Sequence, residues 1–251
     1  MANQFKKVIK SYTTPLVNSI IINSLNRHLI ILAIPLFFAG NLYGQSVAKQ
    51  KSRFLAGIYH QKNLNIYGFS LGFGSTDDDD RYTNTYGFKI EVPGIGVLLP
   101  LFPLGPVAKD SVAFLKLTQK PMYEKIYGFS ISATGTMCHC LTNGIAIGGI
   151  GQYNFQVNGF SLSLFLNTAQ KHNGFQFAAT NSSFIMNGIQ MGYFNKAHDT
   201  NGLQLGLGNF SENTMGVQIG LFNRSKNLKG IQIGLWNVNS KRSLPFINWS
   251  F

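Results

Sequence analysis

Apolar and polar residues alternate with period two along four consecutive copies of a short motif near the C-terminal end of the chain. The copies span residues 187–237 and read NGIQMGYFN, NGLQLGLGN, MGVQIGLFN and KGIQIGLWN, with glycines at Gly188, Gly202, Gly216 and Gly230, so the period is 14 residues. Successive side chains of a strand point to opposite faces, whereas a helix needs apolar residues three and four positions apart. The motif therefore predicts one β-strand per repeat.

The two faces of these predicted strands differ sharply in polarity. The apolar face carries Ile189, Met191, Leu203, Leu205, Val217, Ile219, Ile231 and Ile233. The other face is polar or small and carries Gln190, Gly192, Gln204, Gly206, Gln218, Gly220, Gln232 and Gly234. The residues between copies, such as 195–200, are rich in Asn, Ser and Lys and indicate turns.

Looser versions of the motif extend the array towards the N-terminus. Aromatic-Gly openings occur at residues 67, 86 and 127, and Asn-Gly openings follow at 143, 158 and 173. The chain has 251 residues, of which 45% are hydrophobic and only 12% are charged. These features predict a single all-β domain over residues 45–251 with roughly 12–14 strands joined by turns. The segment 92–107 is apolar and broken by Pro and Gly, which indicates a hydrophobic connection packed inside or against the sheet.

Three arrangements could use such strands. A β-solenoid needs a second inward-facing segment in each coil, and one equivalent position of the turn halves holds Lys196, Phe210, Arg224 and Val238, which form no apolar column. An antiparallel meander needs only one strand and one turn per repeat. Facing lipid, it must close into a β-barrel, whose strands are about 9–11 residues long. We therefore expect an antiparallel transmembrane barrel, with a soluble β-sheet repeat domain or a β-solenoid as the alternative.

The N-terminal region has the features of an export signal. Residues 29–40 form an apolar stretch of 12 residues that follows Arg27 and several upstream lysines. Because a bilayer-spanning helix needs roughly 20 apolar residues, we expect a signal peptide over residues 1–44 rather than an anchor. No cysteine lies near residue 44 to accept a lipid.

The C-terminal end alternates in the same way, with Ile247, Trp249 and the terminal Phe251. This pattern resembles the C-terminal signal that outer-membrane barrels present to their insertion machinery. It predicts outer-membrane lipid and that machinery as partners.

The surplus of basic residues bears on which polyanions the protein could bind. Residues 45–251 hold 17 Lys and Arg against nine Asp and Glu, a net charge of +8. The basic residues are scattered through predicted turns, with no basic helix or arm, so nucleic acid is not an expected partner. In an exported protein the nearer polyanions are lipid headgroups and surface polysaccharide.

The repeats also resemble those of bacterial surface repeat-containing proteins, which are built from tandem Gly-hydrophobic-Gln-hydrophobic-Gly-Leu-aromatic-Asn units and end in a Leu-Pro-Phe-rich tail. The matching tail here is residues 244–249. The resemblance is specific over 187–251 and extends back to about residue 65. It implies a cell-surface or outer-membrane setting in a Gram-negative cell, and it supplies no catalytic residues.

Candidate chemistry is sparse. Cys138 and Cys140 flank His139, which on a strand would point away from both cysteines, and a disulfide between cysteines two apart would be strained. We therefore interpret the cysteines as small side chains at a loop or on one strand face. The aspartate run 77–80 lacks the spacing of a calcium loop, and His60, His172 and His198 have no recognisable Ser or carboxylate partner. No catalytic residue, cofactor or metal site is predicted.

These observations favour an outer-membrane or cell-surface protein with a structural, surface-interaction or passive-pore role. The alternative is a secreted or periplasmic β-repeat module that binds glycan or protein in adhesion. Both hypotheses depend on which way the apolar column faces.

Overall fold

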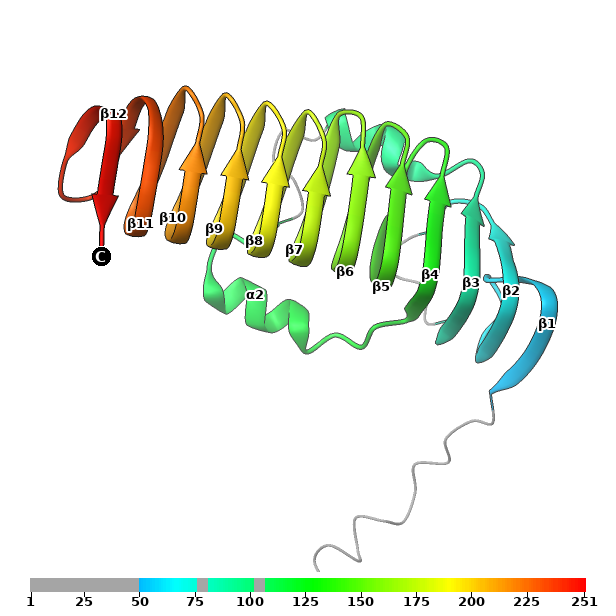
Figure 1. Cartoon of the computed structure of the whole chain (residues 1–251). Coiled ribbons are helices and arrows are strands. Elements are labelled where there is room, and N and C mark those ends of the chain that lie inside the picture. Colours follow the sequence, from blue (N-terminus) through cyan, green and yellow to red (C-terminus); the bar gives the residue numbers. More distant parts are fainter. Residues whose placement is uncertain (1–49, 76–80, 102–106) are drawn as a thin grey trace, which may run out of the picture. The chain divides into compact units, whose positions relative to one another are not determined.

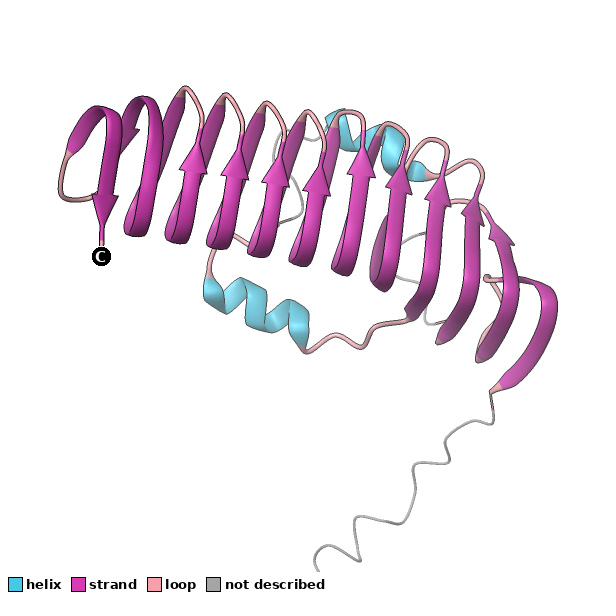
Figure 2. Ribbon diagram, in the orientation of Figure 1, coloured by secondary structure: helices cyan, strands magenta, loops and turns pink. Residues whose placement is uncertain are grey.

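A computed structural model describes residues 50–75, 81–101 and 107–251, which form a β-solenoid of twelve strands (Figures 1 and 2). The strands stack in chain order, and each pairs in parallel with the next from β1 to β11. They are β1 (Lys51–Ile58), β2 (Leu64–Gly72), β3 (Thr83–Glu91), β4 (Glu124–Ser132), β5 (Met137–Gly148), β6 (Gly151–Ser163), β7 (Leu166–Phe177), β8 (Thr180–Met191), β9 (Phe194–Leu205), β10 (Gly208–Ile219), β11 (Phe222–Val238) and β12 (Ser243–Ser250).

Each 14-residue repeat is one full coil of the solenoid. Gly216 of β10 lies beside Gly202 of β9 and Gly230 of β11, so equivalent residues of successive repeats stack directly on one another. The segments expected to be turns belong to the strands, since β9 begins at Phe194 and continues through the Asn-rich stretch to Leu205. A coil therefore contains two strand segments that meet at a bend.

The bend is made by a column of glycines, one in each coil from Gly68 to Gly230. Their φ angles lie between +124° and +144°, a region that L side chains rarely adopt. A Cβ atom at Gly216 would lie 2.0 Å from the carbonyl oxygen of Gly202 in the preceding coil. Glycine is therefore required both for the backbone angle and for the close approach of adjacent coils.

The interior of the regular coils is polar. The repeat glutamines are fully buried and form a ladder in which the amide of each donates to Oε1 of the glutamine one coil earlier, at 2.7–2.9 Å. The ladder runs from Gln232 to Gln176, and Asn248 of β12 donates to Gln232 at 3.1 Å. Because each amide both donates and accepts, burial leaves these groups paired.

A second ladder lines the opposite inner wall. It is formed by five buried asparagines, and each of the first four donates to the asparagine of the next coil at 2.8–2.9 Å: Asn181, Asn195, Asn209, Asn223 and Asn237. Beside it runs a column of small buried residues, Ser183, Ala197, Ser211 and Ser225. The two walls therefore pack small and polar side chains where most solenoids would need apolar ones.

This interior overturns the prediction of an antiparallel transmembrane β-barrel. The pairing is parallel up to β11, and β1 and β12 are the two ends of the strand order, so the sheet does not close on itself. The argument against a solenoid used Lys196 and its equivalents, which point outward. The next residue along, Ala197, points inward. The second inward face exists, and it was missed because it is polar and small rather than apolar.

The connection between β3 and β4 lies outside the coils. It contains a 3₁₀ helix, Ile95–Leu101, and α2, Ser111–Thr118, whose first turn is capped by Asp110 accepting from the Ala113 N–H at 2.8 Å. The 3₁₀ helix packs against β5 and β6, where Gly96 N–H donates to the Gly135 carbonyl at 2.9 Å. The described part of the apolar segment thus lies against the sheet.

The last strand, β12, reverses direction and pairs antiparallel with β11. Within the described ranges no helix is long and apolar enough to cross a bilayer. The predicted signal peptide, residues 1–44, and the aspartate run 77–80 lie outside the described residues.

Candidate functional site

The side of the sheet opposite the glutamine ladder is an outward-facing apolar surface, called here the apolar face. Its three columns follow the corner glycines by one, three and five residues. The first column holds Phe69, Phe88, Phe129, Ile145, Phe160, Phe175, Ile189, Leu203, Val217 and Ile231. The second holds Leu71, Ile90, Ile131, Ile147, Leu162, Phe177, Met191, Leu205, Ile219 and Ile233. The third, at the turn, includes Phe73, Val92, Leu164, Tyr193, Leu207, Leu221 and Leu235.

Nothing in the described part of the chain covers this face. Ile189 is 37% exposed, Ile233 42% and Tyr193 63%. The arrowheads of β2–β10 lie on this side in Figure 1, and neither helix crosses it in that view. The predicted apolar column thus faces away from the protein interior, and the predicted glutamine face is enclosed.

The other broad face is treated differently by the fold. Phe114 of α2 stacks on Phe184 of β8 with ring centroids 4.5 Å apart, and Phe184 is buried. Ala108 N–H, just before α2, donates to Oε1 of Gln170 at 3.0 Å. The chain therefore uses its own insertion to cover apolar surface on that face.

Aromatic rings are stacked from coil to coil at the N-terminal end of the apolar face. The rings of Phe69, Phe88 and Phe129 lie 5.5 and 4.8 Å apart, centroid to centroid. At the adjoining corner Tyr67, Tyr86 and Tyr127 form a parallel stack at 4.9 and 5.0 Å. Burial, together with its neighbours Tyr127 and Tyr67, raises the pKa of Tyr86. The aromatic end is flat and uncharged.

The C-terminal strand continues the apolar face. Trp249 pairs with Ile231 and Ile247 with Ile233, which makes the predicted C-terminal insertion residues an eleventh row of the face. Phe246, which lies opposite Gly234, lines a shallow depression together with Leu221 and Leu235. The terminal Phe251 is 90% exposed.

Charge is segregated from the apolar face. None of its three columns contains Lys, Arg, Asp or Glu. The outward positions of the opposite face include Lys196, Arg224 and Lys226, all exposed. The solenoid therefore has one uncharged apolar side and one polar, basic side.

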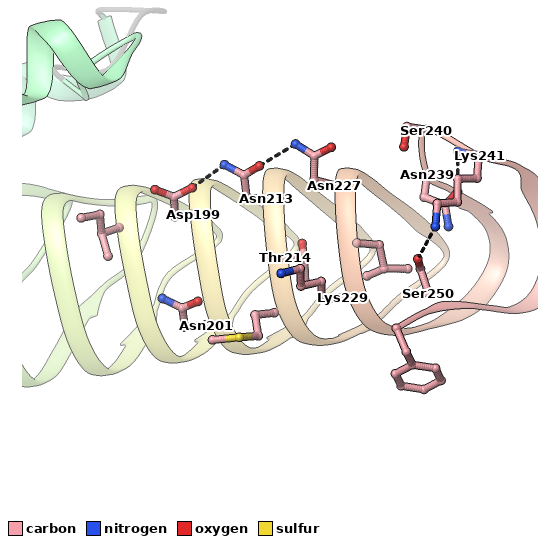
Figure 3. Close-up of a pocket in the computed structure, with 14 residues that line it drawn as sticks. Asp199, Asn201, Asn213, Thr214, Asn227, Lys229, Asn239, Ser240, Lys241 and Ser250 are labelled. Atoms are coloured by element: carbon pink, nitrogen blue, oxygen red, sulfur yellow. Dashed lines mark hydrogen bonds between the residues drawn. The ribbon is translucent and has the colours of Figure 1, made fainter.

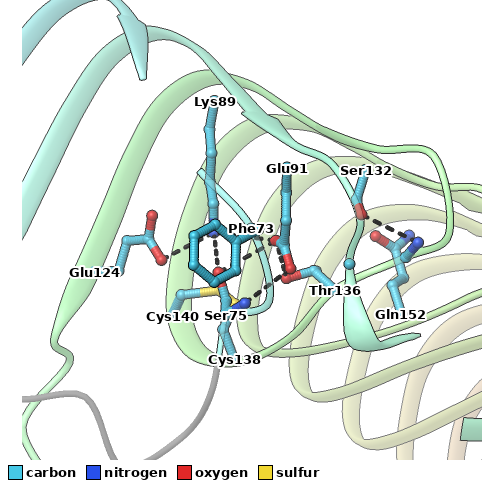
Figure 4. A network of polar contacts seen from close by, with 12 residues as sticks. Phe73, Ser75, Lys89, Glu91, Glu124, Ser132, Thr136, Cys138, Cys140 and Gln152 are labelled. Atoms are coloured by element: carbon cyan, nitrogen blue, oxygen red, sulfur yellow. Dashed lines mark hydrogen bonds and ion pairs between the residues drawn. A yellow bond between two sulfur atoms is a disulfide. The ribbon is translucent and has the colours of Figure 1, made fainter. Parts of the chain in front are cut away.

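A cluster of charged and polar side chains is enclosed in the N-terminal coils (Figure 4). Lys89 replaces a ladder glutamine, and its Nζ lies 2.9 Å from Oε2 of Glu124 and 3.6 Å from Oε2 of Glu91. Glu91 also accepts from the hydroxyl of Thr136 at 2.8 Å and from the N–H of Ser75 at 2.9 Å. These charged side chains are buried, and each lies close to an opposite charge, which is the condition under which buried charges are tolerated.

The cysteines lie next to this cluster. Cys138 and Cys140 both point into the coil and are joined in a disulfide, which corrects the interpretation of two unlinked small side chains. His139 points away from them, as predicted, and packs against Phe155 with ring centroids 4.2 Å apart and ring planes tilted by 45°. Burial lowers the pKa of His139. No group of three or more His, Cys, Asp or Glu in the described ranges could hold a metal ion.

The remaining histidines play different roles. His172 is fully buried between Val157 and Met186 of the neighbouring coils, and burial lowers its pKa to about 4. His198 lies 3.1 Å from Asp199 and stacks on Phe184. His60, near the N-terminal end, accepts a hydrogen bond from the N–H of Phe73 at 3.1 Å.

A groove of about 550 Å³, lined by both polar and apolar side chains, runs along the bend near the C-terminal end (Figure 3). Its lining includes a row of two amides and a carboxylate, in which Asn227 donates to Asn213 at 2.8 Å and Asn213 to Asp199 at 2.6 Å. Lys229 and Lys241 lie at its edge. The groove offers hydrogen-bonding groups at a regular spacing.

Sequence reasoning missed the inner asparagine ladder and the buried ion cluster. The asparagines recur every 14 residues, a signal that was interpreted as turn chemistry. Lys89 occupies the position of the repeat that the glutamines hold in the later copies, and this equivalence could have placed it on the same face as the glutamines. Comparison of the chain with family models, with curated proteins and with solved structures finds no match.

Proposed function

We propose that this protein is an exported surface module that binds another protein through its apolar face. Ten consecutive coils each contribute an aliphatic or aromatic pair to this face, and no described segment covers it. Contiguous exposed apolar patches larger than a few hundred Å² mark interaction sites on soluble proteins. This uncovered face is the observation that carries the proposal.

The setting of the proposal is the cell surface. It rests on the predicted signal peptide over 1–44 and on the resemblance of residues 187–251 to bacterial surface repeat-containing proteins. A β-solenoid suits such a role because stacked coils present an extended, regular surface. The proposed role is binding, with no catalytic step.

Site-specific photo-crosslinking in the cells that make the protein tests this function. A benzophenone amino acid replaces Ile219 on the apolar face or, as control, Phe210 on the opposite face of the same strand. Both positions are 39% exposed, so their accessibility is matched. The proposal expects a protein adduct from position 219 and none from position 210. Equal adducts from both positions, or none from 219, would contradict it.

The C-terminal groove supports a second candidate, the binding of surface polysaccharide. Its amide row and the flanking lysines supply the hydrogen-bond donors and acceptors that sugar hydroxyls need. Titration calorimetry with purified cell-surface polysaccharide tests it, using Asn213→Leu as the variant. Unchanged heat of binding in the variant would exclude the groove.

A further inference from the structure

We infer that the occupant of the apolar face is a second copy of this chain, packed face to face and antiparallel about a two-fold axis through β7. This inference rests on the proposed function and names its partner. Three observations carry it: the size of the face, the order of large and small side chains along it, and the absence of charge on it.

The size of the face matches what a stable dimer buries. Eleven strands, β2 to β12, at about 4.8 Å spacing give a length of roughly 50 Å, and three columns give a width of roughly 14 Å. The strip therefore offers roughly 700 Å² per copy, close to the roughly 800 Å² per partner of a standard protein interface. Two sheets packed face to face bury such a surface at a separation of about 10 Å.

Side-chain size along the face is ordered so that a reversed copy fits. In the first column the N-terminal half is mainly phenylalanine and the C-terminal half is aliphatic, up to Ile231. A two-fold axis at β7 places Phe88 over Ile231 and Phe129 over Val217 of the other copy. In three of the five off-axis pairs of this column a phenylalanine then faces a smaller aliphatic residue, the third such pair being Phe160 and Ile189, which favours interdigitated packing. A two-fold interface must be self-complementary, and this gradient makes it so.

Charge favours the same arrangement. The whole chain carries a net charge of +12, so two copies repel each other through their basic surfaces. The apolar face has no charged residue, and the exposed Lys196, Arg224 and Lys226 lie on the opposite face. Face-to-face contact therefore keeps the positive charges of the two copies far apart.

The first experiment measures the mass of the full chain by sedimentation equilibrium over a range of micromolar concentrations. We expect a dimer for the wild type and for the control Phe210→Glu. Ile219→Glu is expected to raise the dissociation constant at least a hundredfold, because the symmetric interface would bury two carboxylates against apolar surface. Far-UV circular dichroism verifies that both variants keep the sheet.

The second experiment tests the register with single cysteines added under mild oxidation. Phe175→Cys lies at the proposed axis and should crosslink to its own copy. Val217→Cys alone should not, whereas a mixture of Val217→Cys and Phe129→Cys should. Crosslinking of Val217→Cys with itself would overturn the antiparallel register.

The outcomes separate the inference from the function on which it rests. A wild-type monomer that still gives an adduct to a different protein from position 219 overturns the dimer and keeps the binding function. A monomer that gives no adduct in cells and floats with phosphatidylglycerol vesicles overturns both, because lipid would then be the occupant. A monomer whose apolar face is shielded from carbene labelling in isolation also overturns both, since residues 1–49 of the same chain would cover it.

Discussion

Exchanging the polarity of two adjacent residues of β10 tests which side of the sheet is the interior. Gln218 is fully buried in the glutamine ladder, and Ile219 is 39% exposed on the apolar face. The two single variants are Gln218→Leu and Ile219→Gln. Ordinary hydrophobic-core reasoning predicts that the second is the damaging one, and the structure predicts the opposite.

The magnitude follows from the hydrogen bonds of Gln218. Its amide donates to Oε1 of Gln204 at 2.7 Å, and its Oε1 accepts from Gln232 at 2.7 Å. Leucine removes these two bonds together with the longer contacts of the same amide to Ser211 Oγ and the Arg224 carbonyl, at 3.2 and 3.4 Å, and it leaves Oε1 of Gln204 buried without a donor. An orphaned buried acceptor costs about 1–3 kcal/mol and the second lost bond about 1 kcal/mol, so Gln218→Leu should lower the free energy of unfolding by about 2–4 kcal/mol. Ile219→Gln loses only contacts with neighbouring strands, below about 1 kcal/mol.

Urea denaturation followed by tryptophan fluorescence provides the measurement. Trp236 and Trp249 lie in β11 and β12, next to the altered coil, so they report its unfolding. All three proteins are compared at concentrations where they share one oligomeric state, because dimerisation itself shifts stability. The interior assignment is refuted if Ile219→Gln lowers the free energy of unfolding more than Gln218→Leu does. A residue of the protein interior would be expected to lose about 2–5 kcal/mol.

Three further predictions concern the corner, the buried histidine and the ion cluster. Gly216→Ala should destabilise the fold by at least about 2 kcal/mol in the same assay, because its φ of +142° is strained for alanine and the new Cβ would lie 2.0 Å from the preceding carbonyl; Met215→Ala, beside it, should cost less than half as much. The imidazole of His172 has a pKa of about 4 in the folded chain and about 6.5 in the unfolded chain, so between these values the unfolded chain binds one more proton. The free energy of unfolding should therefore fall by on the order of 3 kcal/mol as the pH drops from 6.5 to 4. His172→Met should flatten that part of the pH profile of stability, and an unchanged profile would contradict the assignment. Glu124→Gln should cost up to about 3–5 kcal/mol in denaturant, because the buried ammonium of Lys89 then depends on the more distant carboxylate of Glu91, 3.6 Å away. Adding Lys89→Met should recover part of the loss, and an additive loss would contradict the pairing.

The repeat pattern was sufficient to predict an all-β chain, its strand alternation and the composition of each face. It was not sufficient to predict which face is inside, because alternation defines two sides without assigning either to the interior. Leucine is more hydrophobic than glutamine, which would usually place Leu205 inside and Gln204 outside, yet Gln204 is the buried residue. In-register stacking explains this, since each amide finds an identical partner one coil away and the interior is satisfied without apolar side chains.

The antiparallel strand pairing was predicted wrongly for a related reason. A coil of parallel strands needs two segments with inward-facing residues. The prediction judged the second segment by Lys196 and its equivalents, which face outward, whereas the inward-facing residues begin one position later, at Ala197. The buried cluster around Lys89 depends on Glu124, which follows it by 35 residues across an insertion, and no spacing rule connects the two. Such contacts become visible only when the coils are stacked.

The identity of the coils from β8 to β11 makes the length of this protein adjustable in fixed steps. Every ladder amide needs only the equivalent amide on either side, so excising residues 208–221 joins β9 to β11 with both amide rows continuous. Each such step would shorten the molecule by roughly 5 Å and remove one row of outward aliphatic groups. Duplication or loss of a 42-nucleotide unit in the gene would therefore tune the reach of the protein without redesigning its interior.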